Sequence, residues 1–247
     1  MTVIVAHRGA SARAPENTME AFRLAHEDGA DAIELDVHLT ADGQLAVIHD
    51  DTLERTTDRF GTLAEIAMDE VRLADAGATF SGPQGDFPFR GTGLTVPTLP
   101  EVLAWLPPAL GLVIEIKARA AADGVVDAVR GHRVREERLS VISFDEQALD
   151  RVRELDRDIR TGYLLVPGQS VEAALVWATE HGHVGVHPWD DDLGMDPMPI
   201  ITLAKAYGRE VGCWVVNDAA RMQQLAASGL WGFVTDLPDV ARAALPR

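Results

Sequence analysis

The chain has 247 residues, of which 47% are hydrophobic, and its formal net charge is −17 at pH 7. This length and hydrophobic content are typical of a single domain with one large core. The acidic charge argues against a nucleic-acid partner, because binding to a polyphosphate backbone depends on clustered Lys and Arg.

One cysteine, Cys213, excludes an internal disulfide and a cysteine metal cluster within the chain. We expect it to be a core thiol. The apolar start before His7 and Arg8 lacks the basic segment, long apolar run and cleavage site of a signal peptide. No run of about twenty uncharged apolar residues occurs elsewhere. We therefore expect a cytoplasmic protein without stable membrane insertion.

Short β-branched runs alternate with helical segments along the chain, which is typical of repeated βα units around a parallel sheet. The sequence therefore predicts a (β/α)8 TIM barrel, and we expect 1–247 to form one domain. The eight predicted strands are 3–6, 32–37, 111–117, 139–144, 160–166, 184–187, 210–216 and 232–236.

The first helix is predicted to begin at Asn17 or Thr18. Residues from Asn17 to Glu20 have the pattern of a capping box after a proline, in which a polar cap is followed three residues later by an acid. Met19 and Phe22 would then share the apolar face of this helix with residues further along.

A further apolar run, 45–49, follows the second strand too closely for a helical crossover. The pair Asp42-Gly43 is a strong signal for a tight turn. The sequence therefore predicts a β-hairpin projecting from the end of the second strand. Residues whose numbers sum to about 85 would face one another, which places His49 opposite Asp36.

The stretch 51–97 breaks the regular alternation. It contains a helical pattern at 63–74 and a Gly- and Pro-rich segment at 76–95. We interpret it as a small insertion over the barrel mouth within the same domain.

Charged residues recur at a spacing of two on two of the predicted strands. Glu34 and Asp36 share one face of the second strand, and Glu115 and Lys117 share one face of the strand that follows the insertion. Charged residues belong near the carboxyl ends of barrel strands, where active sites of this fold assemble. Three converging carboxylates need a compensating charge, and a hard divalent cation supplies it. Ion pairs with Arg, or a structural salt bridge between Lys117 and Glu115, are the alternatives.

Two histidines end neighbouring elements at the same mouth. His7 ends the first strand and His49 ends the hairpin. Cleavage of a phosphodiester requires one group that takes a proton from the attacking hydroxyl and another that protonates the leaving alkoxide, and histidine performs either role near neutral pH. Arg8 and Lys117 add positive charge for a phosphate.

Together with their spacing, these residues closely resemble the glycerophosphodiester phosphodiesterases. The resemblance extends in order along nearly the whole chain, which makes it far more specific than any one tripeptide. Its motifs are His7-Arg8-Gly9, Pro15-Glu16-Asn17-Thr18, Glu34-Leu35-Asp36-Val37, Asp42-Gly43, His49-Asp50, Leu53-Glu54-Arg55-Thr56-Thr57, the segment 97–103, Glu115-Ile116-Lys117, Ser143-Phe144, Trp214-Val215-Val216-Asn217 and Thr235-Asp236-Leu237-Pro238.

The resemblance implies roles for the matching positions. Glu34, Asp36 and Glu115 match the family's ligands for Mg2+ or Ca2+. His7 and His49 match its acid-base pair, and we assign His7 as the base and His49 as the acid. This implies metal-dependent catalysis.

The resemblance also implies a substrate site. Arg8 and Lys117 would contact the phosphate. Trp214 is similar to an aromatic residue that lines the glycerol side of the pocket, and Phe144 would contribute there, although packing on a barrel strand is the alternative for such an aromatic. Val215 departs from the family, which often has Thr at this position, and the departure concerns specificity more than chemistry.

Several other polar residues have supporting or open roles. Asp50 and Asn17 match motif positions and are expected to support neighbouring residues or to cap a helix. His187 ends a strand and either lines the pocket or packs in the core. Asp236 is expected to hold the last turn in place.

The implied reaction is hydrolysis of a glycerophosphodiester to glycerol 3-phosphate and an alcohol. Direct attack by water and initial attack by a neighbouring glycerol hydroxyl, which gives a cyclic phosphate, are both compatible with these residues. Two other functions remain as alternatives: a lysophospholipase D or sphingomyelinase D activity on a longer lipid, and a non-catalytic barrel that binds phosphorylated ligands. The leaving alcohol, the choice of metal and the oligomeric state stay open.

Overall fold

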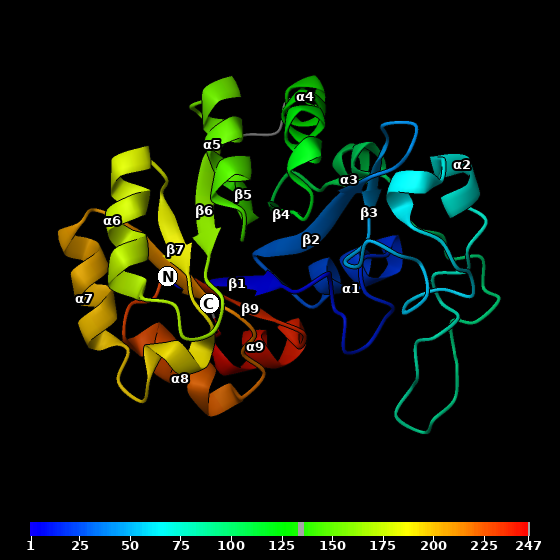
Figure 1. Ribbon diagram of the computed structural model, residues 1–247. Coiled ribbons are helices and arrows are strands. Elements are labelled where there is room, and N and C mark those ends of the chain that lie inside the picture. The colour runs from blue at the N-terminus through cyan, green and yellow to red at the C-terminus, as the bar shows by residue number, and fades with distance from the viewer. Residues whose placement is uncertain (133–135, 247) are drawn as a thin grey trace.

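The computed structural model describes residues 1–132 and 136–246, and these fold as a closed barrel of parallel strands surrounded by helices (Figure 1). Within the described residues the ring runs β1, β2, β4, β5, β6, β7, β8, β9, and β9 pairs back with β1. The predicted (β/α)8 barrel is confirmed. Its strands are β1 Val3–Ala6, β2 Ala32–Leu39, β4 Gly111–Ile116, β5 Leu139–Ser143, β6 Arg160–Leu164, β7 Gly185–His187, β8 Glu210–Cys213 and β9 Gly232–Thr235.

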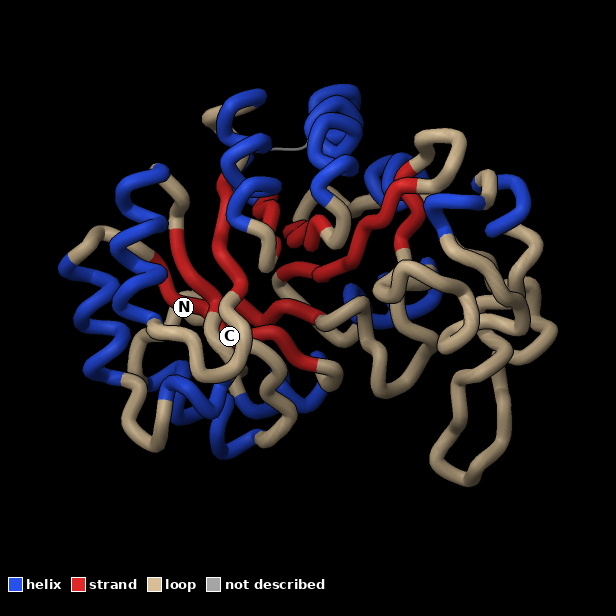
Figure 2. The backbone as a smooth tube through the Cα atoms, viewed as in Figure 1, coloured by secondary structure: helices blue, strands red, loops and turns tan. Residues whose placement is uncertain are grey.

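The helices lie outside the strands, as the blue and red segments of Figure 2 show. Their apolar faces pack against the outer face of the ring in two large clusters, while a smaller cluster that includes Val5, Val113 and Leu164 lies among the strands. No described helix combines the length and the apolar composition required to cross a bilayer. The α-helices are α1 Met19–Glu27, α2 Met68–Val71, α3 Leu99–Trp105, α4 Ala122–His132, α5 Glu146–Leu155, α6 Val171–His181, α7 Met198–Ala206, α8 Ala219–Ala227 and α9 Pro238–Ala244.

The first helix begins one residue later than the predicted capping box requires. Thr18 is the N-cap, and its hydroxyl accepts a hydrogen bond from the Ala21 amide at 3.2 Å. Asn17 is occupied elsewhere, because its side chain bonds to Asp36. The prediction of a box from Asn17 to Glu20 was therefore wrong, although the start at Thr18 was among the predicted positions.

The hairpin is present, but its register differs from the prediction by one residue. Strand β3 (Leu45–Val47) pairs antiparallel with β2, and the facing residues sum to 84, as in Val37 opposite Val47. The Ile48 amide, not that of His49, donates to the Asp36 carbonyl. The turn is centred on Asp42 because the Thr40 amide donates to the Gln44 carbonyl across it.

The 51–97 segment lies beside the β2–β3 hairpin and α1, coloured cyan to teal in Figure 1, and is mostly loop in Figure 2. The helix predicted at 63–74 was wrong: a 3-10 turn at Leu63–Glu65 is followed by the short α2. The apolar residues that gave the helical pattern instead form a small cluster around Leu63, Met68 and Val71, which joins Ile48 of the hairpin.

Several predicted strands end earlier in the structure, at the mouth of the barrel. The run 210–216 ends at Cys213, and the run 160–166 ends at Leu164. Beyond Cys213, the Trp214 amide donates to the Pro188 carbonyl, outside the regular ladder. Trp214, the first residue after β8, lines the pocket described next.

Candidate active site

Three carboxylates from β2 and β4 meet on one face of these neighbouring strands. Asp36 lies directly beside Glu115 in the parallel pairing of these strands, and Glu34 lies two residues earlier on the same face of β2. All three are buried, with exposed fractions of 2% for Glu34, 0% for Asp36 and 8% for Glu115. One oxygen from each lies within 4.8 Å of the others. The predicted convergence of these side chains is therefore present.

Asp36 is held from two sides. Its Oδ2 accepts a hydrogen bond from Asn17 Nδ2 at 2.8 Å and lies 3.2 Å from Arg8 Nε. Its Oδ1 is buried, lies 3.7 Å from Lys117 Nζ and accepts no hydrogen bond from the described residues. A buried carboxylate oxygen without a hydrogen bond is costly, and a bound cation would offset this cost.

Arg8 and Asn17 both take a left-handed backbone conformation, with φ values of 53° and 57°. Such angles are uncommon for residues other than glycine and concentrate at functional sites. The Asn17 amide donates to the Arg8 carbonyl at 3.0 Å, which links the two residues. The strained backbone aims both side chains at Asp36.

The three buried carboxylates do not all stay ionised unless a metal ion is bound beside them. Burial, followed by the charges of Asp36 and Glu115, raises the pKa of Glu34 well above its usual range. Burial and the neighbouring Asp36 raise the pKa of Glu115 to about 7. Burial also opposes ionisation of Asp36, but Arg8 and Lys117 outweigh it and lower the pKa of this carboxyl. The site therefore holds one firmly ionised carboxylate and two that take up protons when no metal is bound.

His7 forms a dyad with Asp236. The ring Nδ1 lies 2.6 Å from Asp236 Oδ1, which also accepts a hydrogen bond from the Ser11 hydroxyl at 2.9 Å. Asn217 Nδ2 donates to the second carboxylate oxygen at 2.7 Å. Burial works against ionisation of Asp236, but the bonds from these partners lower its pKa to about 2. An ionised Asp236 fixes the proton of His7 on Nδ1 and leaves Nε2 for the pocket.

His49 forms a second dyad with the same geometry. Its Nδ1 lies 2.6 Å from Asp50 Oδ1. Arg55 Nε donates to Asp50 Oδ2 at 2.7 Å, and this bond is the largest of the causes that hold the pKa of Asp50 far below its usual range. Burial lowers the pKa of His49 itself, against the opposing effect of Asp36.

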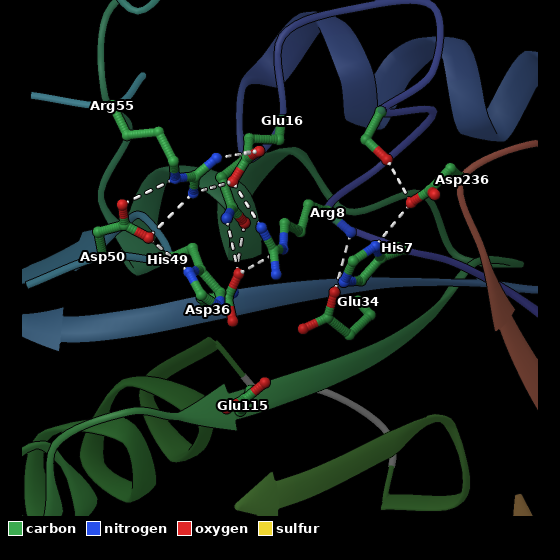
Figure 3. A network of polar contacts seen from close by, with 12 residues as sticks. His7, Arg8, Glu16, Glu34, Asp36, His49, Asp50, Arg55, Glu115 and Asp236 are labelled. Carbon is green, nitrogen blue, oxygen red and sulfur yellow. Dashed lines mark hydrogen bonds and ion pairs between the residues drawn. The ribbon is translucent and has the colours of Figure 1, made fainter. Parts of the chain in front are cut away.

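Arg55, from the 51–97 segment, connects the His49–Asp50 dyad to Arg8 through the carboxylate of Glu16. Glu16 accepts hydrogen bonds from Arg55 and from Arg8 Nη1, each at 2.8 Å. Figure 3 shows the resulting chain of contacts from Asp50 through Arg55 and Glu16 to Arg8, with His7 and Asp236 on the other side. Arg8 is thereby held between Glu16 and Asp36.

A pocket of about 250 Å³ opens onto these groups. Phe144 and Trp214 form its aromatic wall, with ring centroids 5.7 Å apart in an edge-to-face arrangement, and Trp214 Nε1 donates to the His187 carbonyl at 2.9 Å. Asp36 lies beneath this surface. The residues that line the pocket are His7, Arg8, Glu34, His49, Glu115, Lys117, Ile142, Phe144, Leu164, Trp214 and Val234.

The structure brings together every residue that the sequence placed in the site. The salt bridge considered for Lys117 is also present, because Lys117 Nζ donates to Glu115 Oε1 at 2.7 Å.

His187 does not line the pocket: its ring lies inside the barrel against Trp231, with a centroid distance of 5.7 Å. Burial lowers the pKa of this histidine to about 4.

Sequence reasoning missed the functional contacts of Glu16, Arg55 and Asn217, and it gave Asp236 only a structural role. Glu16, Arg55 and Asn217 all lie in segments that resemble family motifs, which was the available signal. Their partners are distant in sequence, as in the contact of Asn217 with Asp236 or of Glu16 with Arg55, and no spacing rule predicts such pairs.

The carboxylate centre fits a divalent cation. Oxygen ligands from carboxylates are those that Mg2+ and Ca2+ prefer. The unbonded Oδ1 of Asp36 and the raised pKa values of Glu34 and Glu115 are the features expected of side chains that bind a cation. One oxygen from each carboxylate lies within 4.8 Å of the others, which is close enough for one ion to contact all three.

The fold and the site together define a (β/α)8-barrel enzyme whose pocket lies at the carboxyl ends of the strands. The family model described as "Glycerophosphoryl diester phosphodiesterase family" matches residues 7–240. The chain belongs to this family, and it is therefore a phosphoric diester hydrolase.

Relatives and solved structures agree with the family match. A glycerophosphodiester phosphodiesterase of Caldanaerobacter subterraneus is 31% identical, with 96% of this chain and 95% of that protein covered. The crystal structure of a glycerophosphodiester phosphodiesterase from Agrobacterium tumefaciens has a TM-score of 0.85 at 32% identity and covers 98% of this chain and 100% of that chain. A phosphodiesterase of Oleispira antarctica, solved with the product sn-glycerol-3-phosphate, has a TM-score of 0.87 at 27% identity and covers 100% and 98%.

Proposed function

We propose that this enzyme hydrolyses glycerophosphodiesters to glycerol 3-phosphate and an alcohol, with a divalent cation and two histidines in the reaction. One observation carries the proposal: two imidazoles, each bonded to an aspartate at 2.6 Å, line one pocket together with Glu34 and Glu115, and Asp36 lies beside these two carboxylates. The product-bound Oleispira antarctica structure supports the choice of substrate.

Glu34, Asp36 and Glu115 would hold the cation, which we expect to be Mg2+ or Ca2+. Bound there, the ion supplies Lewis-acid polarisation of a phosphate oxygen. The chain's own contribution is to keep Asp36 ionised through Arg8 and Asn17 and to keep the three oxygens close together. This arrangement excludes bulk water from the ligands, which are almost fully buried.

The two histidines carry the protons. His7 Nε2 takes the proton of the attacking hydroxyl, either of water or of the neighbouring glycerol, as a new P–O bond forms. His49 Nε2 gives its proton to the leaving alkoxide as the other P–O bond breaks. Each ring is oriented by its aspartate through Nδ1, so Nε2 is the nitrogen that faces the reaction.

Two cationic and two aromatic side chains complete the substrate site. Arg8 and Lys117 neutralise the phosphate, and Arg8 is preset by its bonds to Glu16 and Asp36. Trp214 and Phe144 form the apolar wall against which the glycerol carbons would lie. The pocket's volume of about 250 Å³ favours a glycerol-sized group over the acyl chain of a lysolipid.

We further propose that 51–97 is an insertion within a single domain. Its apolar cluster shares Ala46 and Ile48 with the hairpin, and Arg55 contributes directly to the His49 dyad. A segment that supports an active-site residue in this way is not an independent unit.

The test is the release of choline from glycerophosphocholine, measured with Mg2+, with Ca2+ and with EDTA. We expect turnover with a metal, its loss in EDTA and its recovery when metal is restored. Lysophosphatidylcholine, assayed in parallel, should be cleaved much more slowly. Full activity in EDTA, or in the Glu115→Ala variant, would contradict the metal role, and preference for the lysolipid would replace the proposed substrate by a longer one.

A further inference from the structure

A second group of metal-ligand side chains lies at the opposite end of the barrel from the active site. It consists of Asp150 on α5, His181 at the end of α6 and His183 just before β7. One ligand atom from each lies within 4.8 Å of the others. His183 precedes its strand, whereas His7 follows the end of β1 and Glu115 lies next to the last residue of β4. The group is therefore separate from the carboxylate centre.

The three side chains are already held in place. His181 Nδ1 lies 2.8 Å and His183 Nε2 lies 3.3 Å from the same oxygen, Asp150 Oδ1. Trp177 stacks against both rings, with centroid distances of 4.8 Å and 4.5 Å. Between the histidines, Gly182 takes a φ of 78°, which turns the chain sharply enough for both rings to approach Asp150.

His183 provides the main evidence that this group binds a ligand. It has no exposed surface, and its Nε2 has no hydrogen-bond partner within residues 1–132 and 136–246. Its Nδ1 lies 2.7 Å from the Thr161 hydroxyl oxygen. The proposal below requires the tautomer in which Nδ1 donates its proton to the Thr161 hydroxyl, so that Nε2 presents a lone pair toward the carboxylate of Asp150. In that tautomer the two acceptors, 3.3 Å apart, repel each other unless a bound metal ion lies between them.

The contact with Thr161 is itself typical of a metal ligand. A histidine that binds a metal through one ring nitrogen generally donates the N–H of the other to a nearby oxygen, which fixes the tautomer. Two imidazole nitrogens and one carboxylate oxygen form a ligand set that Zn2+ accepts, with a fourth position open to water. Mg2+ and Ca2+ prefer oxygen ligands and are not expected here.

We propose that Asp150, His181 and His183 bind a divalent transition metal of the Zn2+ class. The ion ties α5 to the turn between α6 and β7, and it stabilises the fold because the unfolded chain does not bring these ligands together. Arg153 lies close to Gly182, and its charge opposes a bound cation. The affinity is therefore expected to be lower than that of a structural zinc finger.

The test is calorimetric titration of the whole protein with Zn2+, in buffer containing excess Mg2+, together with thermal unfolding. We expect one Zn2+ per chain and a higher melting temperature with Zn2+. The His181→Ala variant should bind Zn2+ at least about tenfold more weakly and lose the thermal shift, since one of three protein ligands is removed. The His183→Gln variant should also bind Zn2+ more weakly and lose the thermal shift. Gln is chosen at this position because His183 is buried and a small change in size disturbs the core less.

Two matched variants locate the ion. His132→Ala removes an exposed histidine of α4 whose ring bonds to the Ala128 carbonyl, and it should leave Zn2+ binding unchanged. Glu115→Gln alters the carboxylate centre and should also leave it unchanged. If Glu115→Gln abolishes Zn2+ binding while His181→Ala does not, the ion binds at the active site and the proposal is overturned. Equal binding by the wild type, His181→Ala and His183→Gln would overturn it as well, and the cluster would then be a metal-free contact between helices.

Discussion

The two histidine dyads of the active site have the same geometry but different supports. In both, Nδ1 lies 2.6 Å from an aspartate oxygen. Asp236 is held by the neutral side chains of Ser11 and Asn217. Asp50 is held by a cation, Arg55, which comes from the 51–97 segment outside the barrel. One imidazole thus depends on the barrel itself and the other on an added segment.

The difference matches the two proposed roles. A base benefits from an aspartate that stabilises the imidazolium formed when the proton is taken up, and the neutral partners of Asp236 leave its full negative charge facing His7. An acid benefits from a ring that gives its proton up readily. The pKa of His49 is lowered by burial, and Arg55 partly neutralises Asp50. The two supports therefore differ in the charge that each aspartate presents to its ring.

The largest expected effect is loss of either imidazole. We expect His7→Ala and His49→Ala each to lower kcat by about 10²- to 10⁴-fold, the usual contribution of general acid-base catalysis. The two variants should differ with a substrate whose leaving group is nitrophenolate, which departs without protonation. This substrate should restore much of the activity of His49→Ala and little of that of His7→Ala. Steady-state kinetics with both substrates measures the difference.

The opposite result would exchange the assignments. Rescue of His7→Ala and not of His49→Ala by the activated substrate would make His7 the acid and His49 the base. Equal rescue of both variants would show that neither ring protonates the leaving group. Either result would contradict the proposed link between the groups that hold each aspartate and the role of its histidine as base or acid.

The next effect concerns the acidic centre that lies between the dyads. Because the pKa of Glu115 is raised to about 7 and that of Glu34 is raised well above its usual range, Mg2+ must displace protons at neutral pH. We expect the apparent Mg2+ affinity to fall by as much as about a hundredfold per pH unit below pH 7, about tenfold for each proton displaced. Calorimetry at several pH values measures this slope, and Glu115→Gln should reduce it. An affinity independent of pH would contradict the raised pKa values.

The same protons affect the stability of the metal-free protein. The folded chain keeps a proton on Glu115 that the unfolded chain releases near pH 4.5. The free energy of unfolding should therefore fall as the pH rises from about 4.5 to about 7, and saturating Mg2+ should remove this decline. Thermal unfolding with and without Mg2+ provides the measurement.

Much of the barrel was predictable because its strands are short, β-branched runs that alternate with helical segments. The spacing of two predicted that Glu34 and Asp36 share a face of β2, and the structure places Glu115 beside Asp36. The failures have physical reasons. The apolar spacing around Leu63 and Met68 is that of a helix, but these residues fill an irregular cluster against the hairpin instead.

The supports of the two histidines were only partly predictable. Asp50 follows His49 directly in the sequence, so its place beside His49 could be predicted. Asp236 lies 229 residues from His7, so this contact could not be predicted from spacing. Arg55 and Glu16 are 39 residues apart and meet through irregular loops. Periodicity describes residues within one element, and it carries no information on which loops meet at the barrel mouth.

A smaller effect is expected from the aspartates themselves. Asp236→Asn should lower kcat by on the order of thirtyfold, because the amide neither fixes the tautomer of His7 nor stabilises its charged form. Asp50→Asn should cost less, on the order of tenfold, because an acid loses its positive charge in the reaction and depends less on a carboxylate that stabilises this charge. Substrate KM should change little in both variants. If Asp50→Asn lowered kcat more than Asp236→Asn did, the proposed difference between the two dyads would be wrong.

The smallest effect isolates the contribution of the 51–97 segment. Arg55→Gln leaves both dyads intact but removes the cation that bonds to Asp50 and Glu16. We expect kcat to fall by only about threefold, because a half-exposed ion pair is weak, and the pH limb that reports His49 should move upward as a positive charge leaves its surroundings. Arg72→Gln is the matched control, since Arg72 pairs with Glu101 on α3, and neither residue lines the active-site pocket. If Arg55→Gln and Arg72→Gln gave the same pH profile, Arg55 would only attach the 51–97 segment to the barrel. The proposed difference between His7 and His49 would then depend on Asp50 and not on Arg55.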